Sequence, residues 1–487
     1  MKPKNSLKIL NDIGQFYITY LLFITGIICI SFLIAYLSAL EMHLYAIAII
    51  LGFSVFIISF VNTEAALYIF IFSMLLGPEF IVGQIGGSAL LGRGITLRFD
   101  DFLLVIIGFS WFAKSAIYKE LGLFLRTPLN LPIFFYTISS LFVTCLGMIT
   151  GSVNPLSGFF YVLKYIEYFI VYFMVVNHLH SEVQLKRFVF CSLLTCLLVS
   201  LYGLYQIPLG GRITAPFEGE IGEPNTFGGY LVFMMAVASG LFLHPGKRKS
   251  SYQYMLGVVI FISFITLLFT LSRSSYLAFV FLYLSLIIFS EKKLFLLSLL
   301  FLALIISPFI TPLSVKERVM FTFTQPKQSG QVEIGKLRLD TSASARIIDW
   351  TSALSDFTRK PLFGYGVTGY GFMDAQIPRI LLETGFLGLT AFLYLMYSIF
   401  KMAYQRLKEA TVPYNKGLVV GYLAGFIALL FHAIGTNTFI IVRIMEPFWL
   451  FTGIVVMLPF LEEAKQTQML PEIEMNGLKH KKVQEGF

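Results

Sequence analysis

Arg273 stands between two apolar runs that leave no room for a loop. The sequence Thr-Leu-Ser-Arg-Ser-Ser at residues 270–275 joins one run directly to the next. An arginine at membrane depth costs a few kcal/mol unless it is paired. Its guanidinium could pair with a carboxylate from another helix, or it could bind the oxygens of a phosphate group in bidentate fashion. The sequence leaves both partners open, and we expect Arg273 at the rim of a bilayer.

Residues 210–230 form a polar stretch that leads into an apolar run. Its ionisable and amide side chains are those of Arg212, Glu218, Glu220, Glu223 and Asn225. Pro224 and the glycines of this stretch are typical of a tight turn back into a membrane. Taken alone, the stretch is most simply interpreted as a solvated turn.

A longer polar segment covers residues 311–375. We expect an amphipathic helix from Ser344 to Phe357, with Arg346 near its start. One face of this helix would carry Ile347, Trp350, Ala353 and Leu354. Glycines follow at positions 364, 366, 369 and 371. Because neither a strand nor a Gly-Lys-Ser/Thr sequence accompanies them, they do not predict a nucleotide site, and we interpret them as a turn that lets a substrate approach the backbone.

The elements that must hold these residues are membrane-spanning helices. Hydrophobic residues make up 57% of the 487-residue chain, charged residues make up 13%, and the mean hydropathy is +0.80. A soluble protein needs roughly 25% charged residues to cover its surface. Apolar runs of about twenty residues recur along the chain, which is typical of a protein with many transmembrane helices. The composition therefore excludes a soluble or a disordered protein.

The distribution of charge predicts the topology. The net charge is +9, but the basic residues stand in short clusters between the apolar runs, which does not indicate nucleic-acid binding. Segments on the side of the N-terminus hold most of the lysines and arginines. The short segments on the other side hold only Arg93, Arg98, Arg212, Arg273, Arg379 and Arg443. By the positive-inside rule we expect both termini in the cytoplasm.

Fourteen apolar segments qualify as spans. They begin near Phe16, Leu44, Ala65, Asp101, Leu131, Gly158, Phe188, Thr226, Met255, Ser275, Leu294, Gln376, Gly417 and Ile440. The third, fourth and tenth are short. The first, from about Phe16 to Leu37, is too long for a cleaved signal peptide, so we expect it to be retained. The four cysteines form no Cys-x-x-Cys pair and predict neither a metal site nor a disulfide framework.

These patterns predict an all-α polytopic membrane protein of about 14 transmembrane helices. We expect a single membrane domain over residues 1–487, with one long, partly helical extracytoplasmic loop at residues 311–375 and a cytoplasmic tail at residues 463–487. Arginines on the outer side are disfavoured by the topology rule, so several of them beside the same loops indicate a function there.

The order of these motifs resembles the bacterial O-antigen polymerase and O-antigen ligase superfamily. The motifs are Arg212 followed by Glu-Pro-Asn at 223–225, Thr-Leu-Ser-Arg-Ser at 270–274, Ala-Arg-x-x-x-Trp at 345–350, Pro-Leu-Phe-Gly-Tyr-Gly at 361–366 and Leu-Leu-Glu-Thr-Gly-Phe-Leu-Gly-Leu at 381–389. The resemblance is firm over residues 205–400. It is looser at Arg98-Phe-Asp-Asp101 and at Arg443-Ile-Met-Glu-Pro-Phe-Trp449.

The resemblance implies a type C-like membrane glycosyltransferase that works without a metal or another cofactor at the outer face of the bacterial plasma (inner) membrane. Its substrate would be a polyprenyl-diphosphate-linked oligosaccharide. Arg212, Arg273 and Arg346 stand at the positions that would hold the diphosphate, and we add Asn225 and Arg443 to this expected binding site. Membrane lipids are expected to contact the chain. A flippase and a chain-length regulator are candidate protein partners.

One departure from the family pattern concerns the acceptor side. Ligases of this superfamily carry a histidine just before the Glu-Thr-Gly helix, whereas this chain has Asp374 at that place and Ala375 in place of a neighbouring asparagine. The change favours an O-antigen or exopolysaccharide polymerase. The alternative is a ligase of lipopolysaccharide assembly, which would transfer the glycan to another acceptor such as lipid A core.

Transfer of a sugar also needs a proton acceptor within hydrogen-bond reach of the acceptor hydroxyl. Asp374 is the first candidate, and Glu223 and Glu218 are the next. Aspartate is favoured just before a helix, so Asp374 could instead be an ordinary N-cap. His432 either reaches the site or packs between helices.

A transporter of an anion or of a lipid-linked sugar is the alternative from another class of protein. Lys164 and Glu167 fall within one expected span, and charges inside a membrane often mark a transport path. Their i, i+3 spacing also permits simple pairing with each other. Transporters tend to show repeated halves, and none is visible here, while the unusual residues gather at the outer face. The sequence therefore favours the enzyme.

Overall fold

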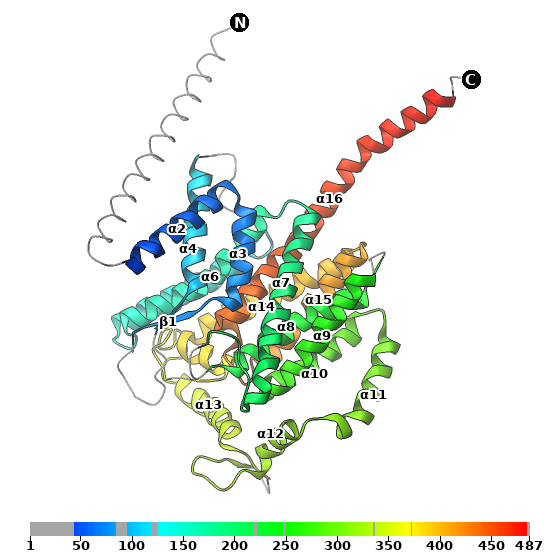
Figure 1. Cartoon of the computed structure of the whole chain (residues 1–487). Helices are drawn as coiled ribbons and strands as arrows, with labels where there is room; N and C mark the ends of the chain where they lie inside the picture. Colours follow the sequence, from blue (N-terminus) through cyan, green and yellow to red (C-terminus); the bar gives the residue numbers. More distant parts are fainter. Residues whose placement is uncertain are drawn as a thin grey trace. The chain divides into compact units, whose positions relative to one another are not determined.

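The computed structural model describes residues 43–83, 95–117, 125–218, 222–246, 250–334, 337–371 and 373–484, and the statements below concern these residues. Figure 1 follows them along the chain. The helices are α2 (His43–Val61), α3 (Thr63–Leu76), α4 (Phe99–Ile117), α5 (Asn130–Ile149), α6 (Pro155–His178), α7 (Glu182–Gln206), α8 (Pro224–Leu243), α9 (Ser250–Phe269), α10 (Arg273–Phe289), α11 (Lys293–Ile310), α12 (Leu313–Thr324), α13 (Thr341–Phe357), α14 (Gln376–Glu409), α15 (Pro413–His432) and α16 (Val442–Gln484).

Short elements connect these helices. Two 3-10 turns are present, η1 (Ile207–Leu209) and η2 (Thr438–Ile440). Two small antiparallel hairpins pair β1 (Glu79–Gly83) with β2 (Ile95–Arg98) and β3 (Glu333–Ile334) with β4 (Leu337–Arg338). The other regular secondary structure of the described residues is α-helical. Every expected span from Leu44 onward corresponds to one of the helices, and the span expected from Phe16 lies outside the described residues.

The helices confirm a multi-pass membrane protein. Nine of the described helices are long and apolar enough to cross a membrane: α5, α6, α7, α8, α9, α11, α14, α15 and α16. The expected total of about 14 is not confirmed. Helices α3 and α10 have 14 and 17 residues, fewer than the roughly 20 that cross a bilayer. Helix α4 carries Asp100, Asp101 and Lys114, which lower its hydropathy.

The described residues divide into two compact units: those between 68 and 104 and from 125 onward form one, and those between 43 and 67 and between 105 and 117 form the other. The larger unit contains every expected site residue. In the smaller unit, Gly52 of α2 lies against the side chain of Ile106 of α4. The larger unit is described from here on.

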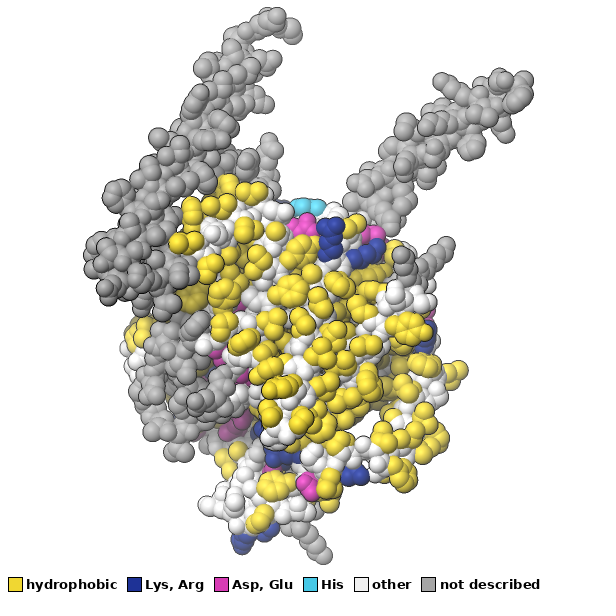
Figure 2. All heavy atoms as spheres, in the orientation of Figure 1, with side chains coloured by type: hydrophobic (Ala, Val, Ile, Leu, Met, Phe, Trp, Pro, Cys, Tyr) yellow, Lys and Arg dark blue, Asp and Glu magenta, His cyan; other side chains and the backbone are white. Residues whose placement is uncertain are grey.

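Helices α8, α15 and α16 lie at the centre of the larger unit. Most residues of α8, of α15 and of the apolar part of α16 (Val442–Glu463) are buried. Small residues bring α8 and α15 together, because a Cβ on Gly240 or Gly421 would overlap the backbone of the other helix. Trp449 of α16 stacks on Tyr168 of α6 and meets Phe169 of the same helix edge-to-face. Helix α11 differs, since only Leu296 is buried in it. Figure 2 shows a broad apolar surface with charged side chains above and below it, as a lipid-facing surface requires.

The segment between α11 and α14 contains α12, the β3–β4 hairpin and α13. Helix α13 begins at Thr341 after the N-cap Asp340, three residues before the expected start at Ser344, and it ends at Phe357 as expected. The residues of the expected apolar face are not all buried. Ala353 is buried, whereas Leu354 is 62% exposed.

Helix α14 is broken at Gly385, where φ is +63° and ψ is −161°. The loop after α13 enters the break and pairs with the helix backbone. Tyr365 N–H and Gly366 N–H donate to the carbonyls of residues 382 and 383, and the N–H groups of residues 386 and 387 donate to the carbonyls of Pro361 and Leu362. A Cβ on Gly364 or Gly385 would overlap the facing backbone. Our interpretation of Gly364 as a position where a substrate approaches the backbone is therefore wrong, because Gly364 lets the loop approach α14.

Candidate functional site

Four arginines from four different segments form a group that we call the arginine cluster. They are Arg212 of the loop before α8, Arg273 at the start of α10, Arg318 of α12 and Arg346 of α13. Burial, followed by the positive charges of the other three, lowers the pKa of Arg212 to about 10. The structure thus brings together the three arginines expected to hold a diphosphate, and it adds Arg318.

Backbone and hydroxyl oxygens hold the guanidinium groups in place. Arg212 Nε donates to the Thr270 carbonyl over 3.1 Å, and Arg318 Nε donates to the Leu271 carbonyl over 3.2 Å. Arg346 Nε donates to the Gly435 carbonyl over 2.9 Å. These bonds use one edge of each guanidinium, and the five donors of an arginine leave further N–H groups for a ligand.

One carboxylate pairs with the cluster directly. Asp340 Oδ2 lies 2.7 Å from Arg273 Nη1, which also donates to Thr322 Oγ1 over 2.6 Å. Of the two partners that the sequence left open for Arg273, the structure therefore provides a carboxylate. Arg273 Nη2 is buried and has no hydrogen-bond partner in the described part of the chain. In the described part of the chain, Arg212, Arg318 and Arg346 form no ion pair. The cluster therefore carries more positive charge than Asp340 neutralises.

The arginines lie where the N-termini of three helices meet. Ser272 is the N-cap of α10, and its hydroxyl donates to Asn225 Oδ1 in the first turn of α8 over 2.7 Å. Asp340, the partner of Arg273, is the N-cap of α13. Free backbone N–H groups and the helix dipole make a helix N-terminus attractive to anions. Charge and backbone therefore favour the same ligand, which is an anion such as a phosphate.

The charges in the cluster are partly desolvated. Burial lowers the pKa of Arg318, and the positive charge of Arg273 lowers it further. Burial likewise lowers the pKa of Arg346, against the opposing effect of Asp374. A guanidinium whose charged form is disfavoured gains when an anion binds beside it, so the cluster is suited to a multiply charged ligand.

Asp374 lies beside this cluster. Its backbone N–H donates to Asp349 Oδ2 over 3.2 Å, and its charge acts on Arg346. The N-cap position of α14 belongs to Ala375 and has no side-chain cap, so Asp374 is not the cap that we considered as an alternative. The Asp374 side chain is exposed. A carboxylate at this position is accessible to a hydroxyl group bound near Arg346.

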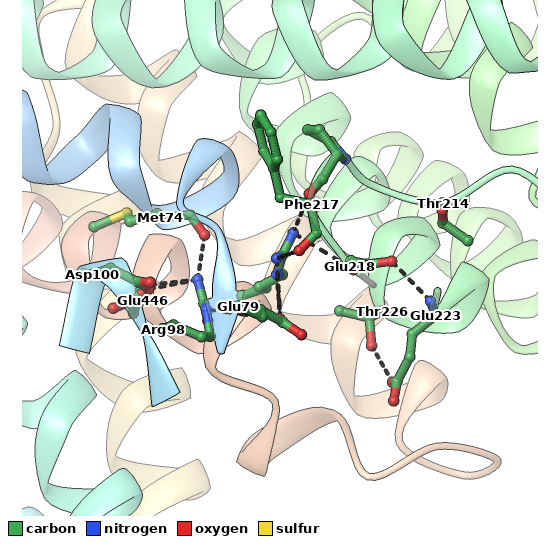
Figure 3. Close-up of polar contacts among 12 residues, drawn as sticks. Met74, Glu79, Arg98, Asp100, Thr214, Phe217, Glu218, Glu223, Thr226 and Glu446 are labelled. Atoms are coloured by element: carbon green, nitrogen blue, oxygen red, sulfur yellow. Dashed lines mark hydrogen bonds and ion pairs between the residues drawn. The ribbon is translucent and has the colours of Figure 1, made fainter. Parts of the chain in front are cut away.

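Glu223 and Asn225 stand at the start of α8 but face different neighbours. Asn225 Oδ1 accepts from Arg212 Nη2 over 3.2 Å and belongs to the arginine cluster. Glu223 Oε2 accepts from the Thr226 hydroxyl over 2.8 Å, and its backbone N–H donates to Glu218 Oε2 over 2.8 Å. Figure 3 shows the contacts of Glu223 and Glu218.

Glu218 and Arg443 belong to a second group, which we call the ion-pair cluster. It consists of Glu79, Arg98, Asp100, Glu218, Arg443 and Glu446. Arg443 Nη2 lies 3.0 Å from Glu79 Oε1, and Arg443 Nη1 lies 3.7 Å from Glu218 Oε1. Arg443 also donates to the carbonyls of Pro216 and Phe217. The structure thus provides Arg443 with protein partners and groups it with Glu218.

Arg98 holds the buried end of this cluster (Figure 3). Its Nη2 donates to the Met74 carbonyl over 2.6 Å and lies 2.5 Å from Asp100 Oδ2. The carboxyl oxygens of Asp100, Glu167 and Glu446 lie within 4.8 Å of one another, a spacing at which a cation could bind. The guanidinium of Arg98 already pairs with Asp100 and Glu446, so it provides the positive charge that a cation would bring. The two looser motifs of the sequence, at residues 98–101 and 443–449, therefore meet in space.

Glu218 predicts a pH effect on stability. Burial raises the pKa of Glu218 to about 7, although Arg443 opposes the shift. A carboxyl group with a raised pKa binds its proton more tightly in the folded state than in the unfolded state. The folded state therefore loses stability as the pH rises from 4.5, the ordinary pKa of a glutamate, to about 7. We expect the melting temperature to fall between pH 5 and pH 8, and to fall less in Glu218→Gln. Equal slopes for the two proteins in thermal unfolding would contradict this.

Glu383 fixes the glycine loop from inside α14. Its Oε1 accepts from Arg379 Nε over 3.0 Å and from the Thr368 backbone N–H over 3.1 Å. Arg379 in turn lies 5.7 Å from the ring centre of Tyr161. Both charged side chains are buried, and their pairing satisfies them. The Glu-Thr-Gly motif therefore has a structural role in holding the loop that ends at Asp374.

Sequence reasoning missed Arg318, Asp340 and Asp349. Arg318 lies in a polar helix with a Lys-Glu-Arg sequence, where nothing distinguishes it from a solvated arginine. Asp340 precedes a helical segment, and its place as an N-cap was a detectable signal. Asp349 follows Arg346 by three residues, which places both on one helix face.

Comparison with known proteins agrees with this arrangement over part of the chain. The O-antigen ligase family matches residues 258–393. The match includes Arg273, Arg318, Arg346 and Asp374, and it does not extend to Arg212. The search of curated proteins found no match. The family match confirms the resemblance to the O-antigen ligase and polymerase superfamily.

Proposed function

Since residues 258–393 carry an O-antigen ligase domain, we propose that the protein is a glycosyltransferase of the bacterial plasma membrane. It polymerises or transfers polyprenyl-diphosphate-linked oligosaccharide repeats at the outer face. The observation that carries this proposal is the arginine cluster, in which four guanidinium groups with one directly paired carboxylate lie at three helix N-termini. A lipid diphosphate has the charge that such a site favours.

The reaction follows from the charges. The acceptor hydroxyl oxygen forms a bond to the anomeric carbon, the bond from that carbon to the diphosphate oxygen breaks, and the electron pair leaves with the diphosphate. Negative charge grows on the leaving group as this bond breaks. Fixed guanidinium groups in a partly desolvated site stabilise that charge in the transition state. Arg212, Arg273 and Arg346, with Asn225, are our proposed diphosphate ligands, and Arg318 joins them.

The hydroxyl proton needs an acceptor, for which we propose Asp374. The electrostatic interaction of Asp374 with Arg346 supports this choice over Glu223 and Glu218, because Glu218 contacts Arg443 instead. We expect Asp374→Asn to lower the transfer rate by about 10² to 10⁴-fold, the usual contribution of a general base. Binding of the lipid diphosphate should change little. The measurement is glycan transfer in membranes against binding to the purified protein, and a variant with the wild-type rate would exclude Asp374.

Within the superfamily we propose a polymerase of O-antigen or exopolysaccharide. The support is the sequence Asp374-Ala375 where ligases carry histidine and asparagine. A ligase that transfers the glycan to lipid A core is the alternative. A flippase that delivers the repeats and a regulator of chain length are the protein partners that a polymerase would need.

Deletion of the gene followed by analysis of surface glycans tests the proposed function. A polymerase predicts single repeats left on the lipid, and a ligase predicts long chains that remain unattached. Unchanged surface glycans and normal lipid-linked intermediates would contradict both. Loss of uptake or export of an anion or of a lipid-linked sugar, without a change in glycan length, would instead support the transporter.

A further inference from the structure

His432 is buried below the arginine cluster at the end of α15. Its ring nitrogens contact two hydroxyl groups. Nε2 lies 3.2 Å from Ser275 Oγ, and Nδ1 lies 2.8 Å from Thr438 Oγ1. The sequence left open whether His432 reaches the site or packs between helices. Packing between helices does not fully describe it, because its ring is also part of a polar network.

Two serines connect this ring to the anion site. Ser275 Oγ donates to Ser272 Oγ over 2.8 Å, and Ser272 Oγ donates to Asn225 Oδ1 over 2.7 Å. The same oxygen of Asn225 accepts from Arg212 Nη2 over 3.2 Å. His432 is thus linked through three hydrogen bonds to a side chain that contacts the arginine cluster.

The direction of these bonds fixes the tautomer of His432. Each hydroxyl group has a single proton to donate. Ser272 uses its proton toward Asn225, and Ser275 uses its proton toward Ser272, so Ser275 Oγ must accept from His432 Nε2. In a neutral imidazole Nδ1 is then an acceptor. The Thr438 hydroxyl lies 2.8 Å from Nδ1 and 3.3 Å from the Thr436 carbonyl, so the shorter contact is the one in which Nδ1 accepts its proton.

The chain of bonds also fixes the amide of Asn225. Its Oδ1 faces two donors, the Ser272 hydroxyl and the Arg212 guanidinium. A flipped amide would place Nδ2, itself a donor, against both of them. Nδ2 therefore lies on the other side of the amide, where no described residue accepts from it. It is available to donate to an anion beside Arg212.

Close packing keeps this arrangement in place. A Cβ on Gly228 of α8 would overlap the Ser275 hydroxyl, and a Cβ on Gly229 would lie 3.0 Å from His432 Cε1. The serine and the imidazole therefore lie directly against the backbone of α8 and have little space to rotate away. The orientation of Asn225 is set by the helices below it.

We propose that His432, Ser275 and Ser272 form a one-way hydrogen-bond chain that orients Asn225, so that Asn225 Nδ2 donates to a phosphate oxygen bound at the arginine cluster. His432 is a positioning residue, since it acts through Asn225. The identity of the ligand as a lipid diphosphate rests on the proposed function, whereas the direction of the chain rests on the contacts alone.

A double-mutant cycle tests this proposal with undecaprenyl diphosphate as the probe and the full-length protein in lipid nanodiscs. Asn225→Ala should weaken binding about tenfold, the usual effect of losing a hydrogen bond to a charged group. His432→Leu should weaken it to a similar degree. The double variant should bind as Asn225→Ala does, because His432 acts through Asn225. Independent effects that multiply in the double variant would overturn the proposal.

A conservative variant separates positioning from folding. In His432→Gln the side-chain amide nitrogen can take the place of Nε2 and donate to Ser275, so binding should return to within about threefold of the wild type. A His432→Gln protein that is folded but binds as poorly as His432→Leu would count against the chain. Binding in His432→Leu equal to the wild type would also overturn it and would leave the proposed function intact.

The tautomer provides a readout that needs no ligand. Nitrogen-15 spectra of histidine-labelled protein, with His432 assigned by its loss in His432→Gln, should show Nε2 protonated and Nδ1 unprotonated. The opposite tautomer would reverse the chain and refute it. A wild-type protein that fails to bind the probe, with the expected tautomer present, would overturn the proposed function and the ligand of Asn225, but not the chain itself.

Discussion

Arg346→Ala should abolish glycan assembly while the protein still inserts into the membrane. The substitution removes a partly buried guanidinium that donates to the Gly435 carbonyl and faces Asp374. Loss of one fixed donor to a developing negative charge typically costs about 10² to 10³-fold in rate. Within the described residues Arg346 forms no ion pair, so its removal leaves no buried carboxylate without a partner. The measurement is the length distribution of surface glycans beside the amount of protein in the membrane fraction.

Arg273→Ala should have an effect on assembly at least as large. It also leaves Asp340, which is 2% exposed, without its guanidinium, so part of its effect should appear as lower stability. Arg359→Ala is the matched control, because Arg359 lies at the end of the same segment, is 73% exposed and pairs only with Asp356 among the described residues. Glycans of wild-type length in the Arg346 variant would remove that residue from the site.

Gly385→Ala should prevent α14 from holding the glycine loop. A side chain at a φ of +63° is strained, which costs about 1–3 kcal/mol. The new Cβ would also lie 2.5 Å from the Leu362 carbonyl oxygen, and the backbone there cannot yield without breaking its bonds to α14. We expect a large fall in the melting temperature or in the yield of folded protein, and glycan assembly should be lost with it. Thermal unfolding of the purified protein measures the effect.

The control for this substitution is another glycine of the same loop. Gly371 has open space around the position of a Cβ, and its φ is not positive. Gly371→Ala should therefore leave the melting temperature within about 1 °C, as exposed substitutions usually do. If the Gly385 and Gly371 variants unfold at the same temperature, the break in α14 has no structural importance.

Much of the arrangement could be predicted because it depends on local sequence. Apolar runs specify helices in a membrane whatever surrounds them, so each expected span from Leu44 onward is helical. The number of true spans could not be predicted, since α3 and α10 are too short to be assigned by length. Three of the four members of the arginine cluster, Arg212, Arg273 and Arg346, were identified because they stand at the positions to which the family resemblance assigns the diphosphate. Arg273 was also conspicuous by itself, since an arginine between two apolar runs requires an explanation.

The pairing of charges could not be predicted, because it depends on contacts between distant segments. Arg212 and Arg443 look alike in the sequence, but the structure places Arg212 beside three other arginines and gives Arg443 two carboxylates. The partner of Arg273 lies 67 residues away at Asp340. The glycine loop was misinterpreted for the same reason, since its partner is the broken helix α14.

The meeting of three helix N-termini limits what substitutions can reveal about this site. Peptide dipoles carry no proton to lose, so their contribution to the potential is the same in acidic and alkaline medium. It also persists when any one guanidinium is deleted. A polyanion should therefore still bind weakly to every variant that lacks one arginine. Only a variant that lacks several of these side chains would show how much of the affinity comes from the main chain.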